Sequence, residues 1–219
     1  MDVARLRIKP IIRLLRRSYA HPGTALEYGN PLEILVATVL AAQSTDKLVN
    51  TVTPELFRKY PTVEAFARAD RAELERMIHS TGFFRMKAKH IIGAAQRIVA
   101  AYGGVVPDSM AELVTLPGVA RKTANIVLSA GYGKAEGIAV DTHAGRLSRR
   151  LGLSREEDPV KVERDLMALV PEKDWLDFNF LLVEHGRAVC QARKPKCPEC
   201  FLRRLCPSAV KFFPELKAK

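Results

Sequence analysis

The chain has 219 residues, of which 35 are basic and 24 acidic, so its formal net charge at pH 7 is +11. Hydrophobic residues make up 47% of the sequence and charged residues 27%, a balance that excludes intrinsic disorder and suits one large domain or two small ones. The longest apolar run, Ile34 to Ala42, is too short to cross a membrane, and Pro10 and Arg13 interrupt the segment where a signal peptide core would lie. We therefore expect a soluble, cytoplasmic protein with no membrane partner.

Helical periodicity recurs along the sequence, and no run alternates between apolar and polar residues as a strand would. The segment from Pro31 to Ala42 is apolar nearly all round, which is typical of a helix enclosed by other helices. The sequence therefore predicts an all-α fold of about ten helices. The other predicted helices are Asp46 to Lys59, two short helices opened by Thr62 and Asp70, a helix through 88–102 that Gly103 and Gly104 end, and helices over 109–114, 119–130, 141–150, 159–170 and 174–189.

The positive charge lies mostly at the two ends of the chain. Residues 1–22 hold six basic and one acidic side chain, and residues 185–219 hold nine basic and two acidic. The residues between these segments hold 20 basic and 21 acidic side chains. If the fold brings the ends together, they form a basic surface suited to nucleic acid; a pair of solvated basic tails is the alternative.

A short motif lies between two of the predicted helices. Pro117-Gly118 predicts a tight turn, after which the start of the next helix presents unpaired backbone N–H groups that can bind a phosphate. Lys122, Asn125 and Ser129 then follow at helical spacing, as a polar stripe on an otherwise apolar helix. Because a lone lysine on such a stripe is usually only solvated, the stripe alone does not indicate chemistry.

Asp141 follows the apolar segment 138–140 and opens the next predicted helix. This position predicts that its side chain is the N-cap of that helix. A capping carboxylate close to an active site can also take part in the reaction, so the sequence leaves both roles open.

All four cysteines lie within 17 residues near the carboxyl end, with the spacing C-x6-C-x2-C-x5-C. So tight a cluster in a chain without an export signal favours a metal site over disulfides. Four thiolates suit either tetrahedral zinc or an iron–sulfur cluster. Because basic residues surround the cysteines, a metal here would fix a short loop that presents cations to phosphate. The cysteines are Cys190, Cys197, Cys200 and Cys206.

These motifs, in this order, resemble the helix-hairpin-helix DNA glycosylases, and most closely the endonuclease III branch. The likeness rests on 116–124, 140–143 and the cysteine spacing, with further matches at 41–46, 80–84 and 87–88, so it covers nearly the whole chain. It implies a two-lobed fold, with a six-helix barrel domain over residues 23–134 that contains the hairpin, and a helical domain from residues 1–22 and 135–219. It also implies that the four cysteines hold a 4Fe-4S cluster.

The resemblance assigns the chemistry to two residues. Lys122 matches the amine that attacks C1′ of a damaged nucleotide, expels the base and forms the Schiff base that leads to β-elimination. Asp141 matches the carboxylate that assists this attack and stabilises cationic character at the sugar. The resemblance thus implies a monomeric, bifunctional DNA glycosylase and abasic-site lyase, which excises oxidised pyrimidines from double-stranded DNA in base excision repair and is associated with the nucleoid through DNA.

Access to C1′ requires that the damaged nucleotide be flipped out of the duplex. Gln43 matches the residue that fills the vacated space. Phe83 falls where the family places an apolar wedge, usually leucine, although a core phenylalanine is an equal alternative. The resemblance and the basic loop also indicate further DNA contacts from Gly118, Ala120, Arg121, His143, Arg193, Lys194 and Lys196.

One residue departs from the family's pattern. The hairpin usually reads Gly-Val-Gly, whereas Ala120 replaces the second glycine here. If this position needs a positive φ, alanine costs about 1 kcal/mol, whereas a helical backbone accepts it. We expect the turn to survive and to contact phosphate somewhat differently.

Two other functions fit part of the pattern. A mismatch-specific adenine or thymine glycosylase would share the fold and the cluster, but the adenine branch normally has no lysine at the position of Lys122 and carries an extra carboxy-terminal domain. A non-catalytic DNA-binding module stabilised by a bound metal would share the cysteines and the basic ends but would neither excise a base nor cleave DNA.

Overall fold

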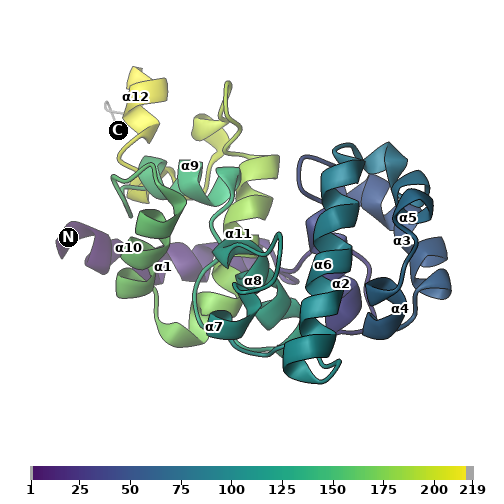
Figure 1. Ribbon diagram of the computed structural model, residues 1–219. Helices are drawn as coiled ribbons and strands as arrows, with labels where there is room; N and C mark the ends of the chain where they lie inside the picture. The colour runs from purple at the N-terminus through teal and green to yellow at the C-terminus, as the bar shows by residue number, and fades with distance from the viewer. Residues whose placement is uncertain (1, 216–219) are drawn as a thin grey trace. The chain divides into compact units, whose positions relative to one another are not determined.

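The computed structural model describes residues 2–215, which fold into two compact units (Figure 1). Unit 1 comprises Met1–Gly23 and Gly137–Lys219, and unit 2 comprises the intervening segment Thr24–Glu136. Each unit has its own hydrophobic core. The described part of the chain contains helices and no strand, so the predicted all-α class is confirmed.

Unit 2 is built around α2 (Pro31–Leu40), which contacts α3, α6 and α8 and is buried along most of its length. Asn30 begins this helix, because its Oδ1 atom accepts the Glu33 N–H at 3.0 Å. The remaining helices of unit 2 are α3 (Asp46–Lys59), α4 (Val63–Ala67), α5 (Arg71–Met77), α6 (Phe84–Tyr102), α7 (Met110–Leu113) and α8 (Arg121–Ile126), with a 3-10 helix, η1 (His79–Thr81), and a π-helix, η2 (Val127–Gly131).

Unit 1 joins the two ends of the chain. Its first helix, α1 (Asp2–Ser18), lies against α10 and α11 (Figure 1). Ile11 and Leu15 of α1 share a core with Phe178 and Leu182 of α11. The helix continues through Pro10, although proline has no N–H for a helical hydrogen bond. The other helices of unit 1 are α9 (Thr142–Arg150), α10 (Pro159–Leu169), α11 (Trp175–Ala188) and α12 (Ala209–Phe212), with 3-10 helices η3 (Glu172–Asp174), η4 (Cys197–Glu199) and η5 (Arg203–Leu205).

Capping side chains begin several helices where the sequence predicted them. Thr62 and Asp70 cap α4 and α5, and Asp141 caps α9. The helix predicted over Asp46 to Lys59 is α3, with these bounds, and its N-cap is Thr45, whose side chain accepts the Leu48 N–H at 3.2 Å. Thr45 has the extended backbone that an N-cap requires, whereas Asp46 is already helical.

The helix predicted over 119–130 is shorter and changes type. α8 begins at Arg121, and after Ile126 the backbone continues as the π-helix η2 through Gly131. A π-helix closes wider i→i+5 hydrogen-bonded turns, which the spacing of apolar residues does not distinguish from an α-helix.

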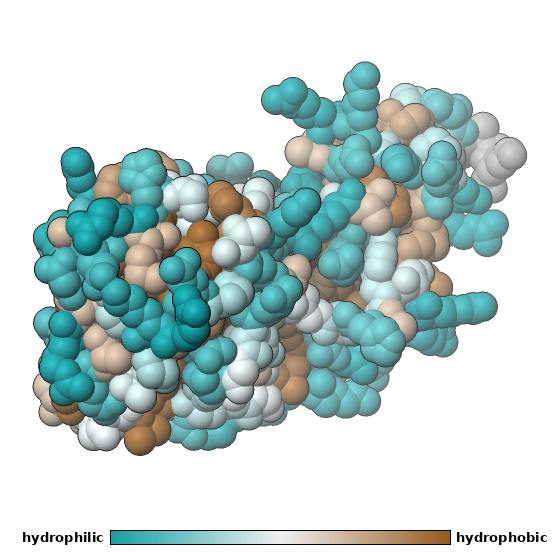
Figure 2. Space-filling view, turned by 90° about the vertical axis from the view of Figure 1, so that its right-hand side faces the viewer, coloured by the Kyte–Doolittle hydropathy of each residue, from teal (hydrophilic) through white to brown (hydrophobic). Residues whose placement is uncertain are grey.

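Hydrophilic residues predominate on the face that Figure 2 shows, and hydrophobic residues there form small, separate patches. Within residues 2–215, none of the helices combines the length and the apolar character that crossing a membrane requires.

Candidate functional site

The turn between α7 and α8 requires glycine at one position only. Gly118 has a φ of +78°, and a Cβ atom there would lie 2.6 Å from Cγ and Nδ1 of His90. Ala120 has φ −91° and ψ 169°, an extended conformation that any residue adopts. The alanine at position 120 therefore introduces no backbone strain, and the predicted turn survives.

Lys122 lies in the first turn of α8 and is exposed. The polar stripe that it begins is not a uniform solvated face. Asn125 is buried, and the half-buried Ser129 donates its hydroxyl to Ile126 O at 3.2 Å. Because Ala124 of α8 and Leu128 of the following η2 are buried in the core of unit 2, the Lys122 amine is both accessible and attached to a fixed backbone.

Gln43, Phe83 and Gly118 line one open hollow of about 270 Å³ in unit 2, although they are far apart in sequence. Phe83 is 65% exposed, so the interpretation of this residue as a core phenylalanine is wrong. Gln43 and Phe83 have φ of 54° and 48°, and they are the non-glycine residues with positive φ in the part of the chain that is described. Such strained backbone often marks functional sites.

Sequence reasoning missed the role of Lys87, which also lines this hollow. It is buried, and its Nζ atom donates to the backbone carbonyls of Leu40 and Thr81. The available signal was its position at the start of the apolar stripe that continues with Ala88 and Ile91 on α6. A lysine on the buried face of a helix needs specific partners.

Asp141 begins α9 in unit 1, and its two carboxylate oxygens have different surroundings. Oδ1 accepts the Ala144 N–H at 2.7 Å, which confirms the predicted N-cap. Oδ2 lies 3.6 Å from Nδ1 of His143, and the Asp141 side chain is 20% exposed. His143 packs against α11, where its Cδ2 atom would lie 2.8 Å from a Cβ atom on Gly186.

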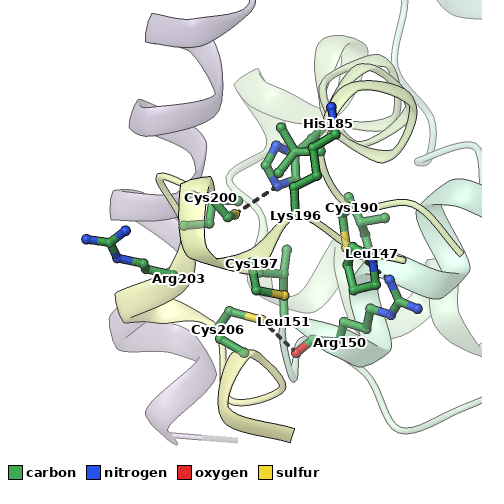
Figure 3. A pocket seen from close by; sticks show the side chains of 14 residues that line it. Leu147, Arg150, Leu151, His185, Cys190, Lys196, Cys197, Cys200, Arg203 and Cys206 are labelled. Atoms are coloured by element: carbon green, nitrogen blue, oxygen red, sulfur yellow. Dashed lines mark hydrogen bonds between the residues drawn. The ribbon is translucent and has the colours of Figure 1, made fainter. Parts of the chain in front are cut away.

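The four cysteines line one cavity in unit 1 (Figure 3). Cys190 follows α11, Cys197 is the first residue of η4, Cys200 follows η4, and Cys206 follows η5. Among the residues described, no three His, Cys, Asp or Glu side chains converge closely enough to hold a single metal ion.

Side chains from neighbouring helices contact two of the sulfur atoms. Arg150 donates to Cys190 Sγ at 3.3 Å and to Gln191 O at 2.7 Å, so it anchors the start of the loop. His185 Nε2 lies 3.4 Å from Cys200 Sγ (Figure 3), and burial lowers the pKa of His185 to about 4. Burial also raises the pKa of the Cys200 thiol to about 11. A bound cation would favour the thiolate and release its proton.

The basic side chains of unit 1 include some that bind partners within the unit and others that are exposed on the loop that carries the cysteines. Arg7 donates to Leu151 O at 3.0 Å and to Leu205 O at 2.6 Å, and Arg16 pairs with Asp174 at 3.0 Å. These two arginines therefore hold the unit together. Arg193, Lys194 and Lys196 are exposed on the loop between Cys190 and Cys197.

The chain matches a family model described as HhH-GPD superfamily base excision DNA repair protein over residues 36–172. It is 54% identical to the endonuclease III of Synechocystis sp. over 203 residues, which are 93% of each chain. The chain belongs to the endonuclease III family. The family that the sequence motifs indicated is therefore confirmed.

Solved structures of endonuclease III with DNA share the fold of this chain. One is a non-covalent complex and another is a trapped covalent intermediate. Each is similar to this chain with a TM-score of 0.89 and 39% identity, over 94% of this chain and 97% of its own. This agreement confirms the predicted helix-hairpin-helix glycosylase fold.

Proposed function

We propose that Lys122 and Asp141 are the catalytic residues of this endonuclease III homologue. The chain is a bifunctional DNA glycosylase and abasic-site lyase for oxidised pyrimidines in base excision repair. The observation that carries the residue assignment is the exposed amine of Lys122, fixed in the first turn of the helix that follows the hairpin.

The proposed reaction begins when Lys122 Nζ attacks C1′ and the bond between C1′ and the base breaks, so that the base leaves with the electron pair and takes up a proton. Asp141 stabilises the cationic sugar and accepts a proton from the attacking amine. Opening of the sugar ring gives a Schiff base, which acidifies the C2′ hydrogen. Loss of that proton breaks the C3′–O bond and expels the 3′ phosphate, and water then releases Lys122.

Two residues of the hollow in unit 2 are proposed to keep the duplex open. Phe83 is exposed and can wedge between bases, and Gln43 can fill the space that the flipped nucleotide leaves. The other proposed DNA contacts are Gly118, Ala120 and Arg121 at the hairpin, His143 beside Asp141, and Arg193, Lys194 and Lys196 on the cysteine loop.

The four cysteines are proposed to hold a 4Fe-4S cluster. They fit it because all four thiols line one cavity, where Arg150 donates to Cys190 and His185 contacts Cys200. When bound, the cluster cross-links the loop through iron–thiolate bonds. Purified protein should absorb in the visible range and contain iron; colourless protein with one zinc per chain would refute the cluster.

We also propose that unit 2 is the barrel domain with the hairpin and that unit 1 is the iron–sulfur domain. The proposed substrate is double-stranded DNA with a damaged base or an abasic site. The protein is proposed to act as a monomer in the cytoplasm, on the nucleoid.

A panel of duplexes tests the assignment. Each duplex carries one oxidised pyrimidine, a mismatched adenine or thymine, or an abasic site, and is incubated with borohydride, which reduces a Schiff base to a stable adduct. We expect adducts on the oxidised pyrimidines and the abasic site, none with Lys122→Gln, and DNA affinity largely kept in that variant. Excision confined to mismatches would indicate the mismatch glycosylases, and binding without excision or an adduct would indicate a DNA-binding module.

A further inference from the structure

Lys87 occupies a position where stability alone does not favour a lysine. It lies in the first turn of α6, on the helix face that packs into the core, and is only 4% exposed. Burial lowers the pKa of Lys87, because desolvation disfavours the charged amine. Replacement of a buried charged group by a well-packed apolar side chain is often neutral or stabilising. A lysine amine at this position therefore points to a geometric role.

The Lys87 amine links two segments that are distant in sequence. Its Nζ atom donates to Leu40 O at 2.7 Å and to Thr81 O at 2.8 Å. Leu40 is the last residue of α2, and Thr81 is the last residue of η1. Carbonyl groups at helix ends lack intrahelical donors, and a cation is favourable at the negative end of a helix dipole. One amine thus fixes the ends of both elements.

Each of these helix ends leads directly into a strained turn. Gln43, three residues after Leu40, has φ 54°, and Phe83, two residues after Thr81, has φ 48°. Non-glycine residues persist in this conformation only where their surroundings hold them there. Gln43, Phe83 and Lys87 line the same hollow, so Lys87 lies between the two turns that it anchors.

We propose that Lys87 is a positioning residue that fixes Gln43 and Phe83 relative to each other for insertion into the DNA duplex. The inference rests on the roles proposed above for these two residues. Without the bridge, the cores of α2 and α6 persist, but the two turns lose their common anchor. The step affected is the opening of the duplex around the damaged base and not the chemistry at Lys122.

Lys87→Met tests this role, because methionine fills similar space without a donor. One substrate is a duplex with a paired oxidised pyrimidine, which has to be flipped. The other is single-stranded DNA with an abasic site, where no base has to leave a partner. We expect Lys87→Met to lower single-turnover excision from the duplex about 10- to 100-fold, while the rate of borohydride trapping on the single strand changes less than about two-fold.

The double variant Gln43→Ala/Phe83→Ala should show the same difference between the two substrates. Adding Lys87→Met to it should cost little more, because all three changes act on one step. The proposal would be overturned if Lys87→Met lowered the rates on both substrates equally. It would also be overturned if Lys87→Met lowered excision from the duplex as much in the triple variant as it does alone. If the double variant excises like the wild type, the roles of Gln43 and Phe83 are themselves wrong, and the proposal falls with them.

Phe66→Leu, a core substitution in the same unit, controls for a general loss of stability. Phe66→Leu should lower Tm, but it should change the rates on the duplex and on the single strand by the same factor. If Lys87→Met does not fold, Lys87→Gln takes its place, because the shorter amide cannot bridge both carbonyls. We expect Lys87→Gln to lower the rate on the duplex far more than the rate on the single strand. Equal losses of rate on the two substrates would again overturn the proposal.

Discussion

At the scale of single residues, Asp141 combines a structural and a proposed catalytic role in one carboxylate. Oδ1 caps α9 through the Ala144 N–H, while Oδ2 lies near His143. Because the helix terminus already fixes its orientation, the carboxylate loses little freedom when it acts on substrate. Asparagine is as good an N-cap as aspartate but has no charge, so substitution can separate the two roles.

Asp141→Asn should lower single-turnover excision by about 100-fold or more, with Tm nearly unchanged. Asp141→Ala should lose the same activity and, in addition, about 1 kcal/mol of the free energy of unfolding, because the cap is lost as well. Excision assays and urea denaturation of the two variants check this. An Asp141→Asn variant as active as the wild type would remove the carboxylate from the reaction.

At the scale of elements, the hairpin shows why its two positions differ in their need for glycine. Position 118 combines a left-handed backbone with close contact to His90, whereas position 120 is extended. An alanine at position 118 would therefore have a strained backbone and a Cβ atom that clashes with His90. The extended backbone of Ala120 accepts a Cβ atom without strain.

Gly118→Ala should destabilise unit 2 by about 2 kcal/mol or more, since the left-handed backbone alone costs roughly 1–2 kcal/mol. Ala120→Gly, which restores the family's usual residue, should change stability by no more than about 1 kcal/mol, mainly through the entropy of the unfolded chain. Urea denaturation compares the two. A larger loss for Ala120→Gly than for Gly118→Ala would contradict the backbone assignment.

Local chemistry explains which elements could be predicted from the sequence. Caps such as Asp70 and Asp141 depend on a few neighbouring atoms, and the apolar stripes of α2 and α6 depend only on helical spacing. The π-helix η2 and the exposure of Phe83 depend on packing against segments distant in sequence. Helical spacing places Lys87 on the buried face of α6, but its partners cannot be predicted from the sequence because they are backbone carbonyls of distant residues.

At the scale of the whole molecule, the net charge of +11 is not all available to DNA. Both basic ends of the chain belong to unit 1, but Arg7 and Arg16 bind partners within that unit. The exposed cations of the cysteine loop, among them Lys194, remain for phosphate. Fewer basic side chains are thus available to bind phosphate than the charge count of the two ends indicates.

Salt dependence of DNA affinity distinguishes these two groups of cations. Each phosphate contact contributes roughly 0.9 to the slope of log affinity against log salt concentration, so Lys194→Ala should lower that slope by about 1. Arg16→Ala, the matched control in the same unit, should leave the slope unchanged because Arg16 pairs with Asp174 and Asp177. An unchanged slope for Lys194→Ala would remove this residue from the phosphate contacts.

Mass spectrometry of the trapped adduct identifies the nucleophile of this protein. Protein reduced with borohydride on an abasic duplex is digested, and the peptide that carries the sugar is sequenced. We expect the modification on Lys122, in the peptide that follows the hairpin. A modification on any other residue, or an adduct of unchanged yield in Lys122→Gln, would contradict the assignment.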